Sequence, residues 1–270
     1  MKKDERAIGL FDSGIGGLTV LKHLISAFPR ESFVYLGDTA RLPYGTKSPE
    51  TIERYLVQNV QYLISRDVKA IIVACNSAST VLLTKNATFT IPVYNVIEPG
   101  AEAALKASTN RRIGVLGTRA TVQAEAYVKA LKKIDPDVYV VQQACSLLVP
   151  LVEEGWEDDP LTNLVIHRYV HPILDHGVDT LILGCTHYPA LESGMRRVVG
   201  PHIQLIDSPA AIASQLAEDF KNGVLGVSSE RRPLKLLTTD ASPSFAEVAT
   251  RLMRPHVIPP LEVVDIGSFS

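Results

Sequence analysis

Two cysteines stand at matching positions in this chain, each at the end of an apolar run. Cys75 directly follows the run Ala70–Ala74, and Cys185 directly follows the run Thr180–Gly184. Most free cysteines are small buried hydrophobic residues, but the polar residues that follow both of these would be awkward in a core. A third cysteine, Cys145, has no such polar partners, and we interpret it as structural.

Two thiols that face each other across a cleft are suited to the inversion of a carbon centre. Inversion requires that a proton is removed from one face of the carbon and delivered to the other, and two fixed groups can do this without moving. One group must then be a thiolate and the other a thiol. The ordinary thiol pKa of about 8.5 is lowered by nearby donors or by a helix N-terminus, which gives a base at neutral pH. Fixed dipoles in a water-poor site have to stabilise the charge that develops on the carbon.

A glycine-rich segment follows the first apolar run and precedes a helical pattern. This segment, Asp12–Gly17, lacks both the G-x-G-x-x-G register and the Gly-Lys-Ser/Thr ending of nucleotide-binding loops. It could be a simple tight turn. Alternatively, its backbone N–H groups and the Ser13 hydroxyl could hold a carboxylate at the helix N-terminus. Asp12 could bind an ammonium group or relay a proton near Cys75.

The elements that must position these residues are short apolar runs that alternate with amphipathic stretches. Their lengths and flanking Gly or Asp residues are typical of buried parallel strands, so we expect an α/β fold with parallel sheets. Two Ser-Pro pairs, at Ser48 and Ser208, predict helix starts. The expected strands are Ala7–Phe11, Phe33–Leu36, Ala70–Ala74, Val93–Ile97, Arg112–Leu116, Val138–Gln142, Thr180–Gly184 and Gln204–Ile206.

A weak internal repeat relates the two halves of this pattern. Chance similarity between apolar strands could explain it, but the repeated segments also end alike, in a hydroxyl-bearing loop or a cysteine. Ligands bind at the carboxyl ends of strands in open parallel sheets, so two facing lobes would place one thiol on each wall of a shared cleft. The matched segments are Ile8–Ser13 with Ile113–Thr118, Ile71–Asn76 with Leu181–Thr186, and Asn95–Pro99 with Ile206–Pro209.

Composition excludes several classes of protein. The 270 residues include 27 Lys and Arg against 29 Asp and Glu, and no segment concentrates the basic residues into the stripe that a nucleic-acid-binding protein needs. Apolar runs are far too short to span a bilayer, and the charged start of the chain does not resemble a signal peptide. The three cysteines are therefore expected to be free thiols in the cytoplasm.

Four segments together resemble the glutamate racemase family. They are Leu10–Val20, Gly37–Gly45, Ala74–Ala78 and Leu183–Pro189, in the family's order within a match from residue 7 to about residue 210. The resemblance implies interconversion of L- and D-glutamate without a cofactor, which supplies D-glutamate for bacterial peptidoglycan. It also implies two pseudo-symmetric α/β lobes with the active site between them. Residues 1–98 and 208–270 would form the first lobe and residues 99–207 the second. We further expect a homodimer.

The resemblance also assigns roles to individual residues. By position, the acid/base cysteines are Cys75 and Cys185, and the groups that assist proton transfer are Asp12, Glu153 and His187. The one departure is Ser77, where the family more commonly has Thr. No metal site is expected, because His187 and Cys185 lack a second ligand pair with zinc-like spacing. The positions expected to bind the amino acid are Asp12, Ser13, Tyr44, Gly45, Asn76, Ser77, Thr118, Thr121, Thr186 and His187.

Two other functions stay open at this point. One is a different member of the two-cysteine superfamily, such as an aspartate racemase or an enzyme similar to maleate isomerase. The other is a two-lobed amino-acid-binding module without catalysis. Such a module has no use for paired thiols, and an exported module would need a signal sequence.

Overall fold

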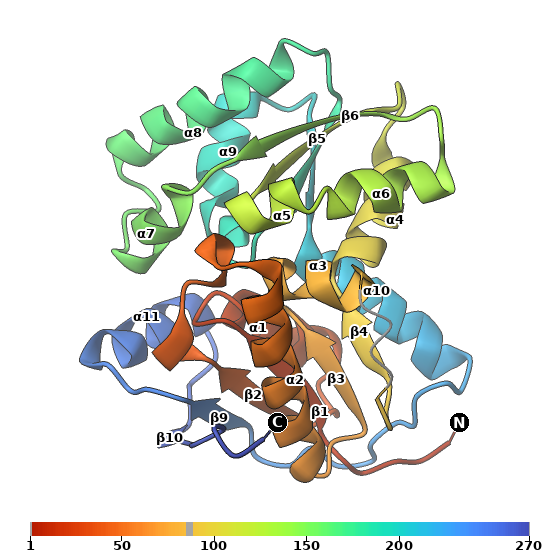
Figure 1. Cartoon of the computed structure of the whole chain (residues 1–270), viewed down its shortest axis with the longest axis vertical. Coiled ribbons are helices and arrows are strands. Elements are labelled where there is room, and N and C mark those ends of the chain that lie inside the picture. Colours follow the sequence, from red (N-terminus) through yellow and green to blue (C-terminus); the bar gives the residue numbers. More distant parts are fainter. Residues whose placement is uncertain (1, 85–88, 270) are drawn as a thin grey trace.

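Two parallel β-sheets form the centre of the fold. The computed structural model describes residues 2–84 and 89–269, with the backbone alone for residues 243 and 244 (Figure 1). The strands are β1 (Ile8–Asp12), β2 (Phe33–Gly37), β3 (Ala70–Val73), β4 (Val93–Asn95), β5 (Arg112–Gly117), β6 (Tyr139–Ala144), β7 (Thr180–Gly184), β8 (Gln204–Asp207), β9 (Lys235–Thr238) and β10 (Leu261–Val263). One sheet has the order β10-β9-β2-β1-β3-β4 and the other β6-β5-β7-β8.

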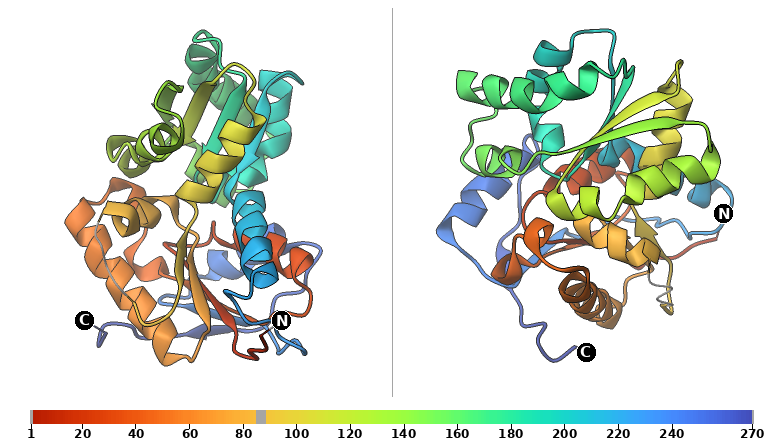
Figure 2. Two further views of the ribbon diagram at one scale, coloured as in Figure 1. Left: turned by 90° about the vertical axis from the view of Figure 1, so that its right-hand side faces the viewer. Right: turned by 45° about the horizontal axis from the view of Figure 1, so that its top comes forward.

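Helices cover both faces of each sheet (Figure 2). Around the first sheet lie α1 (Leu18–Ala27), α2 (Pro49–Ser65), α3 (Asn76–Thr84) and α11 (Pro243–Met253). Around the second lie α5 (Arg119–Gln123), α6 (Ala126–Ile134), α7 (Leu148–Glu153), α8 (Pro160–Leu174) and α9 (Glu192–Val199). The helices α4 (Ile97–Ala107) and α10 (Ser208–Lys221) pack against each other where the two halves meet. Short 3₁₀ turns are η1 (Thr39–Arg41), η2 (Tyr44–Thr46) and η3 (Tyr188–Leu191).

The strand order confirms the fold class predicted from the repeat. The order β6-β5-β7-β8 reproduces the order β2-β1-β3-β4 of the larger sheet, and all these neighbours are parallel. Cys75 therefore follows β3, and Cys185 follows the equivalent strand β7. Each cysteine sits beside the point where the connections leave the sheet in opposite directions, which is where open α/β sheets bind ligands.

The ends of the elements differ from expectation in places. The run Val93–Ile97 was expected to be one strand, but β4 stops at Asn95, whose side-chain oxygen accepts the N–H groups of Ile97 and Glu98 and starts α4. Ser48 caps α2 as predicted, whereas the cap of α10 is Asp207 and not Ser208. A carboxylate there accepts the N–H of Ala210, so the helix begins one residue earlier than the Ser-Pro pair indicated.

Two strands were missed by sequence reasoning. β9 and β10 extend the first sheet on the far side of β2, and α11 lies between them in the chain. Lys235–Thr238 has only two fully buried apolar residues and Leu261–Val263 is half exposed, so neither shows a clear strand pattern. The predicted lobe boundaries fall at the starts of α4 and α10, and they stay a prediction.

One hydrophobic cluster runs through both halves of the molecule. It joins residues of the first half, such as Leu10 of β1 and Leu24 of α1, to residues of the second half, such as Leu183 and Met195. Separate clusters fill the opposite face of each sheet. Because the halves share a core, the carboxyl ends of both sheets are held in a fixed relation.

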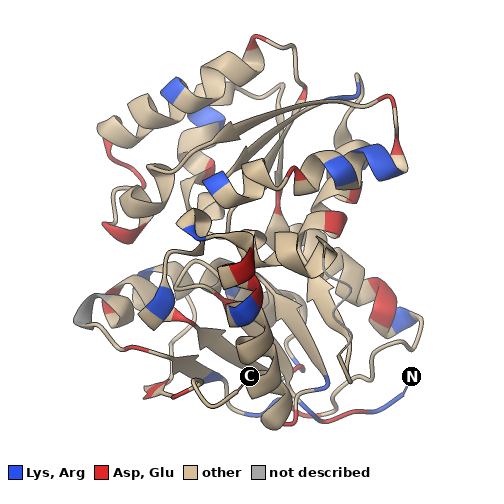
Figure 3. Ribbon diagram, in the orientation of Figure 1, with Lys and Arg blue, Asp and Glu red and all other residues tan. Residues whose placement is uncertain are grey.

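Charged residues of both signs are interspersed over both halves (Figure 3). Within residues 2–84 and 89–269, no helix combines the length and the apolar character needed to cross a membrane.

Candidate active site

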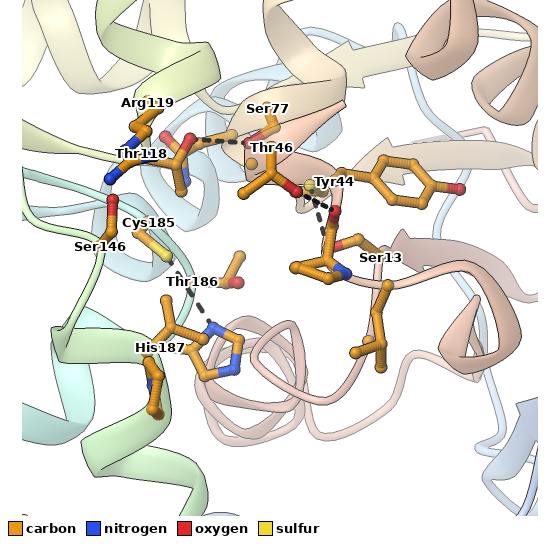
Figure 4. Close-up of a pocket in the computed structure, with 18 of the residues that line it drawn as sticks. Ser13, Tyr44, Thr46, Ser77, Thr118, Arg119, Ser146, Cys185, Thr186 and His187 are labelled. Carbon is orange, nitrogen blue, oxygen red and sulfur yellow. Dashed lines mark hydrogen bonds between the residues drawn. The ribbon is translucent and has the colours of Figure 1, made fainter. Parts of the chain in front are cut away.

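A small cavity of about 290 Å³ lies between the carboxyl ends of the two sheets (Figure 4). It is close to the lower end of the range for ligand pockets, roughly 300–1,000 Å³. Cys185, Thr186 and His187 approach it from one side, and Ser13, Tyr44 and Ser77 approach it from the other. The predicted site residues that line it are Ser13, Tyr44, Gly45, Cys75, Asn76, Ser77, Thr118, Glu153, Cys185, Thr186 and His187.

Both cysteines reach the cavity and are equally exposed. The exposed fraction of each is 5%, so each thiol meets the cavity but is otherwise enclosed. Cys145, in contrast, is fully buried in the core and does not line the cavity. One thiol from each half of the chain therefore lines the same cavity.

The surroundings of Cys75 favour the neutral thiol. Cys75 directly precedes α3, and its Sγ lies 3.4 Å from the Ser13 Oγ. Burial and the nearby carboxylate of Asp12 raise the pKa of Cys75 to about 12, although Ser13 and the backbone N–H of Ala78 oppose the rise. At Cys75 desolvation therefore outweighs the helix N-terminus, which fits the requirement that one of the two groups be a thiol.

The surroundings of Cys185 are different, because an imidazole lies beside it. Nδ1 of His187 is 3.8 Å from the Cys185 Sγ, and Nε2 of the same ring is 3.1 Å from Oε1 of Glu153. Burial lowers the pKa of His187, but the interactions with Cys185 and Glu153 outweigh it and raise the value to about 10. At neutral pH the ring is then a cation that lies beside the Cys185 sulfur. A sulfur, an imidazole and an orienting carboxylate in a row are typical of an activated cysteine.

Asp12 lies behind the wall of the cavity and not on its surface. Its carboxylate accepts hydrogen bonds from the Gly14 N–H, at 3.0 Å, and from the Thr186 hydroxyl, at 3.3 Å. Burial raises the pKa of Asp12, while the charge of His187 and the N–H groups of Gly17 and Gly14 oppose the rise. The N–H groups of Gly14 and Gly17 thus hold the turn's own carboxylate, whereas the sequence left open a simple tight turn or a site for a bound carboxylate.

The glycines of this turn allow the two halves to approach closely. A Cβ on Gly16 would lie 2.4 Å from the His187 ring and 2.5 Å from the Thr186 hydroxyl. The hydroxyl of Thr19 also donates to the Thr186 carbonyl, at 2.8 Å. Gly45 has the same function on the other side, since a Cβ there would lie 2.9 Å from Thr118. These glycines are required by packing between the halves.

Two hydroxyls meet across the site. The Ser77 Oγ is 2.9 Å from the Thr118 Oγ1, so a residue of α3 contacts the loop that follows β5. Thr118 also caps α5 by accepting the Thr121 N–H. Thr121 is fully buried and does not line the cavity. Its Oγ1 lies 3.0 Å from the Thr118 Oγ1 and supports that side chain from behind.

Tyr44 and Asn76 face the cavity, but their polar groups have partners in the protein. The Tyr44 hydroxyl donates to the buried Asp38 carboxylate, and burial beside Asp38 raises the pKa of Tyr44. Asn76 accepts a hydrogen bond from the Tyr127 hydroxyl, at 2.7 Å. Both residues are therefore rigid parts of the wall.

Sequence reasoning missed part of the lining. Most of these residues adjoin a motif that was recognised or follow a strand end, and that rule could have found them. Among the described residues no group of His, Cys, Asp or Glu could hold a metal ion. The additional lining residues are Gly14, Leu42, Pro43, Thr46, Arg119, Ser146, Val149 and Pro150.

Comparison with known proteins agrees with this geometry. The model of the Asp/Glu/Hydantoin racemase family matches residues 10–216. The chain belongs to this family. A glutamate racemase of Geobacter metallireducens is 46% identical over 92% of this chain and 93% of its own length. The resemblance predicted from the four motifs, and with it the enzyme class, are confirmed.

Solved structures of the family share the whole architecture. Glutamate racemase isoform RacE1 from Bacillus anthracis superposes with a TM-score of 0.90 at 36% identity, over 96% of this chain and 97% of that one. Glutamate racemase from Francisella tularensis, solved in complex with D-glutamate, gives a TM-score of 0.88 at 35% identity, over 98% and 99% of the two chains. The predicted two-sheet fold therefore matches that of solved racemases.

Proposed function

We propose that this chain interconverts L- and D-glutamate by proton transfer at the α-carbon, with Cys75 and Cys185 as the two acid/base groups. The observation that carries the proposal is that equivalent strands of two equivalent sheets deliver one thiol each to a single small cavity. The names of the relatives support glutamate as the substrate. No cofactor enters the reaction.

The reaction balances with the two cysteines alone. A thiolate on one wall takes the α-proton, so the C–H bond breaks, an S–H bond forms and the electron pair stays on the carbon. The thiol on the opposite wall then gives its proton to the other face, so its S–H bond breaks and the new C–H bond forms. The roles of the two sulfurs exchange when the other enantiomer binds.

The electrostatics favour one starting state. The His187 cation lies beside the Cys185 sulfur, so we assign Cys185 as the first base, whereas burial keeps Cys75 a thiol at neutral pH. The free enzyme is then prepared for the enantiomer whose α-proton faces Cys185. The opposite reaction requires that a proton first moves from Cys75 to Cys185.

The remaining residues bind or support. Asp12 assists proton transfer at Cys75. The Glu153 carboxylate keeps the His187 ring charged. Thr121 acts through Thr118, since it lies behind it. The residues that contact the amino acid are Ser13, Tyr44, Gly45, Asn76, Ser77, Thr118 and Thr186, which all line the cavity; Tyr44 and Asn76 contribute shape, since their polar groups have partners in the protein. In the cell the enzyme would be a cytoplasmic homodimer that supplies D-glutamate for peptidoglycan, with residues 1–98 and 208–270 as one lobe and residues 99–207 as the other.

A substrate panel followed by circular dichroism tests the proposal. Purified protein freed of small molecules is incubated with each enantiomer of glutamate and aspartate. The circular dichroism signal of both enantiomers of glutamate is expected to decay to zero, and that of aspartate is expected to change hardly at all. Faster racemisation of aspartate would overturn the substrate assignment. Binding of glutamate without loss of its circular dichroism signal would instead indicate a binding module.

A further inference from the structure

An arginine from the end of the chain holds the segment that carries Glu153. Arg251 belongs to α11, beside the first sheet, but its guanidinium reaches the last residues of α7, beside the second. Nη2 donates to the Val152 carbonyl oxygen at 2.5 Å and to the Glu153 carbonyl oxygen at 3.3 Å. Nε donates to Oε1 of Glu157 at 3.1 Å. The side chain therefore joins the two halves of the molecule.

The local backbone is adapted to this arginine. Gly155 follows α7 with φ +78°, a conformation that favours glycine. A Cβ at Gly155 would lie 2.9 Å from Nη1 of Arg251, so a side chain there would displace the guanidinium. The last carbonyl groups of a helix have no partners within the helix, and a cation at that end stabilises it. Backbone N–H groups after α7 already donate to Leu151 and Val152, and Arg251 adds a donor for the Val152 and Glu153 oxygens together with the positive charge.

This contact is directly connected to the chemistry. The backbone oxygen of Glu153 accepts from Arg251, while the side-chain oxygen of the same residue contacts His187. His187 in turn contacts Cys185. We propose that Arg251 is a positioning residue that fixes the Glu153 carboxylate against the His187 ring. This inference rests on the proposed function, in which Cys185 is an acid/base group and His187 is the cation beside it.

The proposal differs from a merely structural role in what it predicts for His187. Without Arg251 the Val152 oxygen still accepts from the Gly155 N–H, but the Glu153 carbonyl loses the guanidinium donor, and the Glu153 carboxylate no longer has a fixed place. The pKa of His187 is raised to about 10 partly by that carboxylate, so removal of the arginine should lower it. A role limited to holding the halves together would reduce stability but would leave the pKa of His187 unchanged.

The test compares Arg251→Met with three other variants. Arg251→Lys keeps a cation but lacks the second nitrogen that donates to Glu157 while Nη2 donates to the carbonyl groups. Glu157→Gln removes the ion-pair partner but leaves an acceptor for Nε. Arg197→Met is the matched control, because Arg197 also pairs with an acid of the second half, Asp158, at 3.5 Å, while its hydrogen bonds go to Ser193 and Asn163 and not to α7 carbonyl groups. Urea unfolding confirms that each variant is folded.

The first readout is independent of catalysis. The His187 ring is titrated by nitrogen NMR of histidine-labelled free enzyme and assigned with His187→Asn. We expect a pKa near 10 in the wild type, Glu157→Gln and Arg197→Met, a lower value in Arg251→Met, and an intermediate value in Arg251→Lys. An unchanged His187 pKa in folded Arg251→Met would overturn the proposal.

The second readout is the pH profile of kcat/KM for glutamate. Arg251→Met should lower kcat/KM about 10-fold, as a small misplacement of a catalytic group does, and should move the alkaline limb to lower pH. Wild-type kinetics in Arg251→Met would refute the positioning role while the racemase activity stood. Absence of racemisation in the wild type would refute the proposed function, and the NMR titration would still decide the role of Arg251.

Discussion

The two walls of the cavity are equivalent in topology and different in charge. Cys75 and Cys185 follow equivalent strands and have the same exposed fraction, 5%. Cys75 nevertheless has a neutral hydroxyl beside it and a buried carboxylate behind it, whereas Cys185 has the His187 cation. The repeat thus fixes where the sulfur atoms lie, and the residues around each sulfur decide which of them carries the proton.

This asymmetry has a defined kinetic signature. The two enantiomers have equal free energies, so the equilibrium constant is unity and kcat/KM must be the same in both directions. A difference between the walls can therefore be seen only in kcat and KM taken separately. A change on one wall should alter kcat more in one direction, with a compensating change in KM.

The largest effect is expected from removal of either sulfur. Cys75→Ser and Cys185→Ser should each reduce racemisation by at least about 1,000-fold, because a serine hydroxyl is a much weaker acid and base than a thiol. Glutamate binding, measured by calorimetry, should be largely retained. Cys145→Ala is the matched control and should remain active. Near-normal turnover in either serine variant would show that the two-base mechanism is wrong.

The next effect is a difference in alkylation of the two thiols in the free enzyme. Because their exposure is equal, the rates at pH 7 compare their thiolate contents, and the thiolate is the nucleophile. Cys185 should react with iodoacetamide about 100-fold faster than Cys75, as followed by peptide mass spectrometry. Equal rates would refute the assigned starting state.

A smaller effect is expected from His187→Asn. The loss of a cation beside Cys185 should reduce kcat about 50-fold in the direction that uses Cys185 as the base, and less in the other. In the wild type, activity should fall as the pH rises through about 10, because His187 then loses its proton. An identical loss of kcat in both directions would remove the assignment of His187 to one wall.

The smallest effect is expected from Asp12→Asn. The amide keeps the shape and one acceptor for Thr186 but removes the charge near Cys75, so a kcat loss of about 10-fold is expected, larger in the direction that uses Cys75 as the base. His187→Asn, measured in the same experiment, is the control, because its larger loss of kcat is expected in the opposite direction. The same preferred direction in both variants would contradict separate roles for the two walls.

The sequence predicts the site better than it predicts how the site is supported. The strand-end rule and the repeat locate Cys75 and Cys185, because both depend on local patterns that survive without tertiary information. The raised pKa of Cys75 could not be predicted, since it depends on burial and on a carboxylate from another strand.

The unpredicted contacts join residues that are distant in the chain. Arg251 contacts Val152 and Glu153 from a helix whose position depends on β9 and β10, and neither strand shows a strong pattern in the sequence. The Thr186 hydroxyl contacts Asp12 only because the two halves pack together over Gly16. Periodicity and motifs carry no information on such pairings.

The most direct test of opposed thiols is the position of solvent deuterium early in the reaction. Each enantiomer of glutamate is incubated with the enzyme in deuterium oxide, and both product and remaining substrate are analysed by mass spectrometry after chiral separation. Opposed groups should give a product with deuterium at the α-carbon and a remaining substrate without it, from either enantiomer. Deuterium that enters the remaining substrate as fast as the product, or a product that keeps its original hydrogen, would contradict the account.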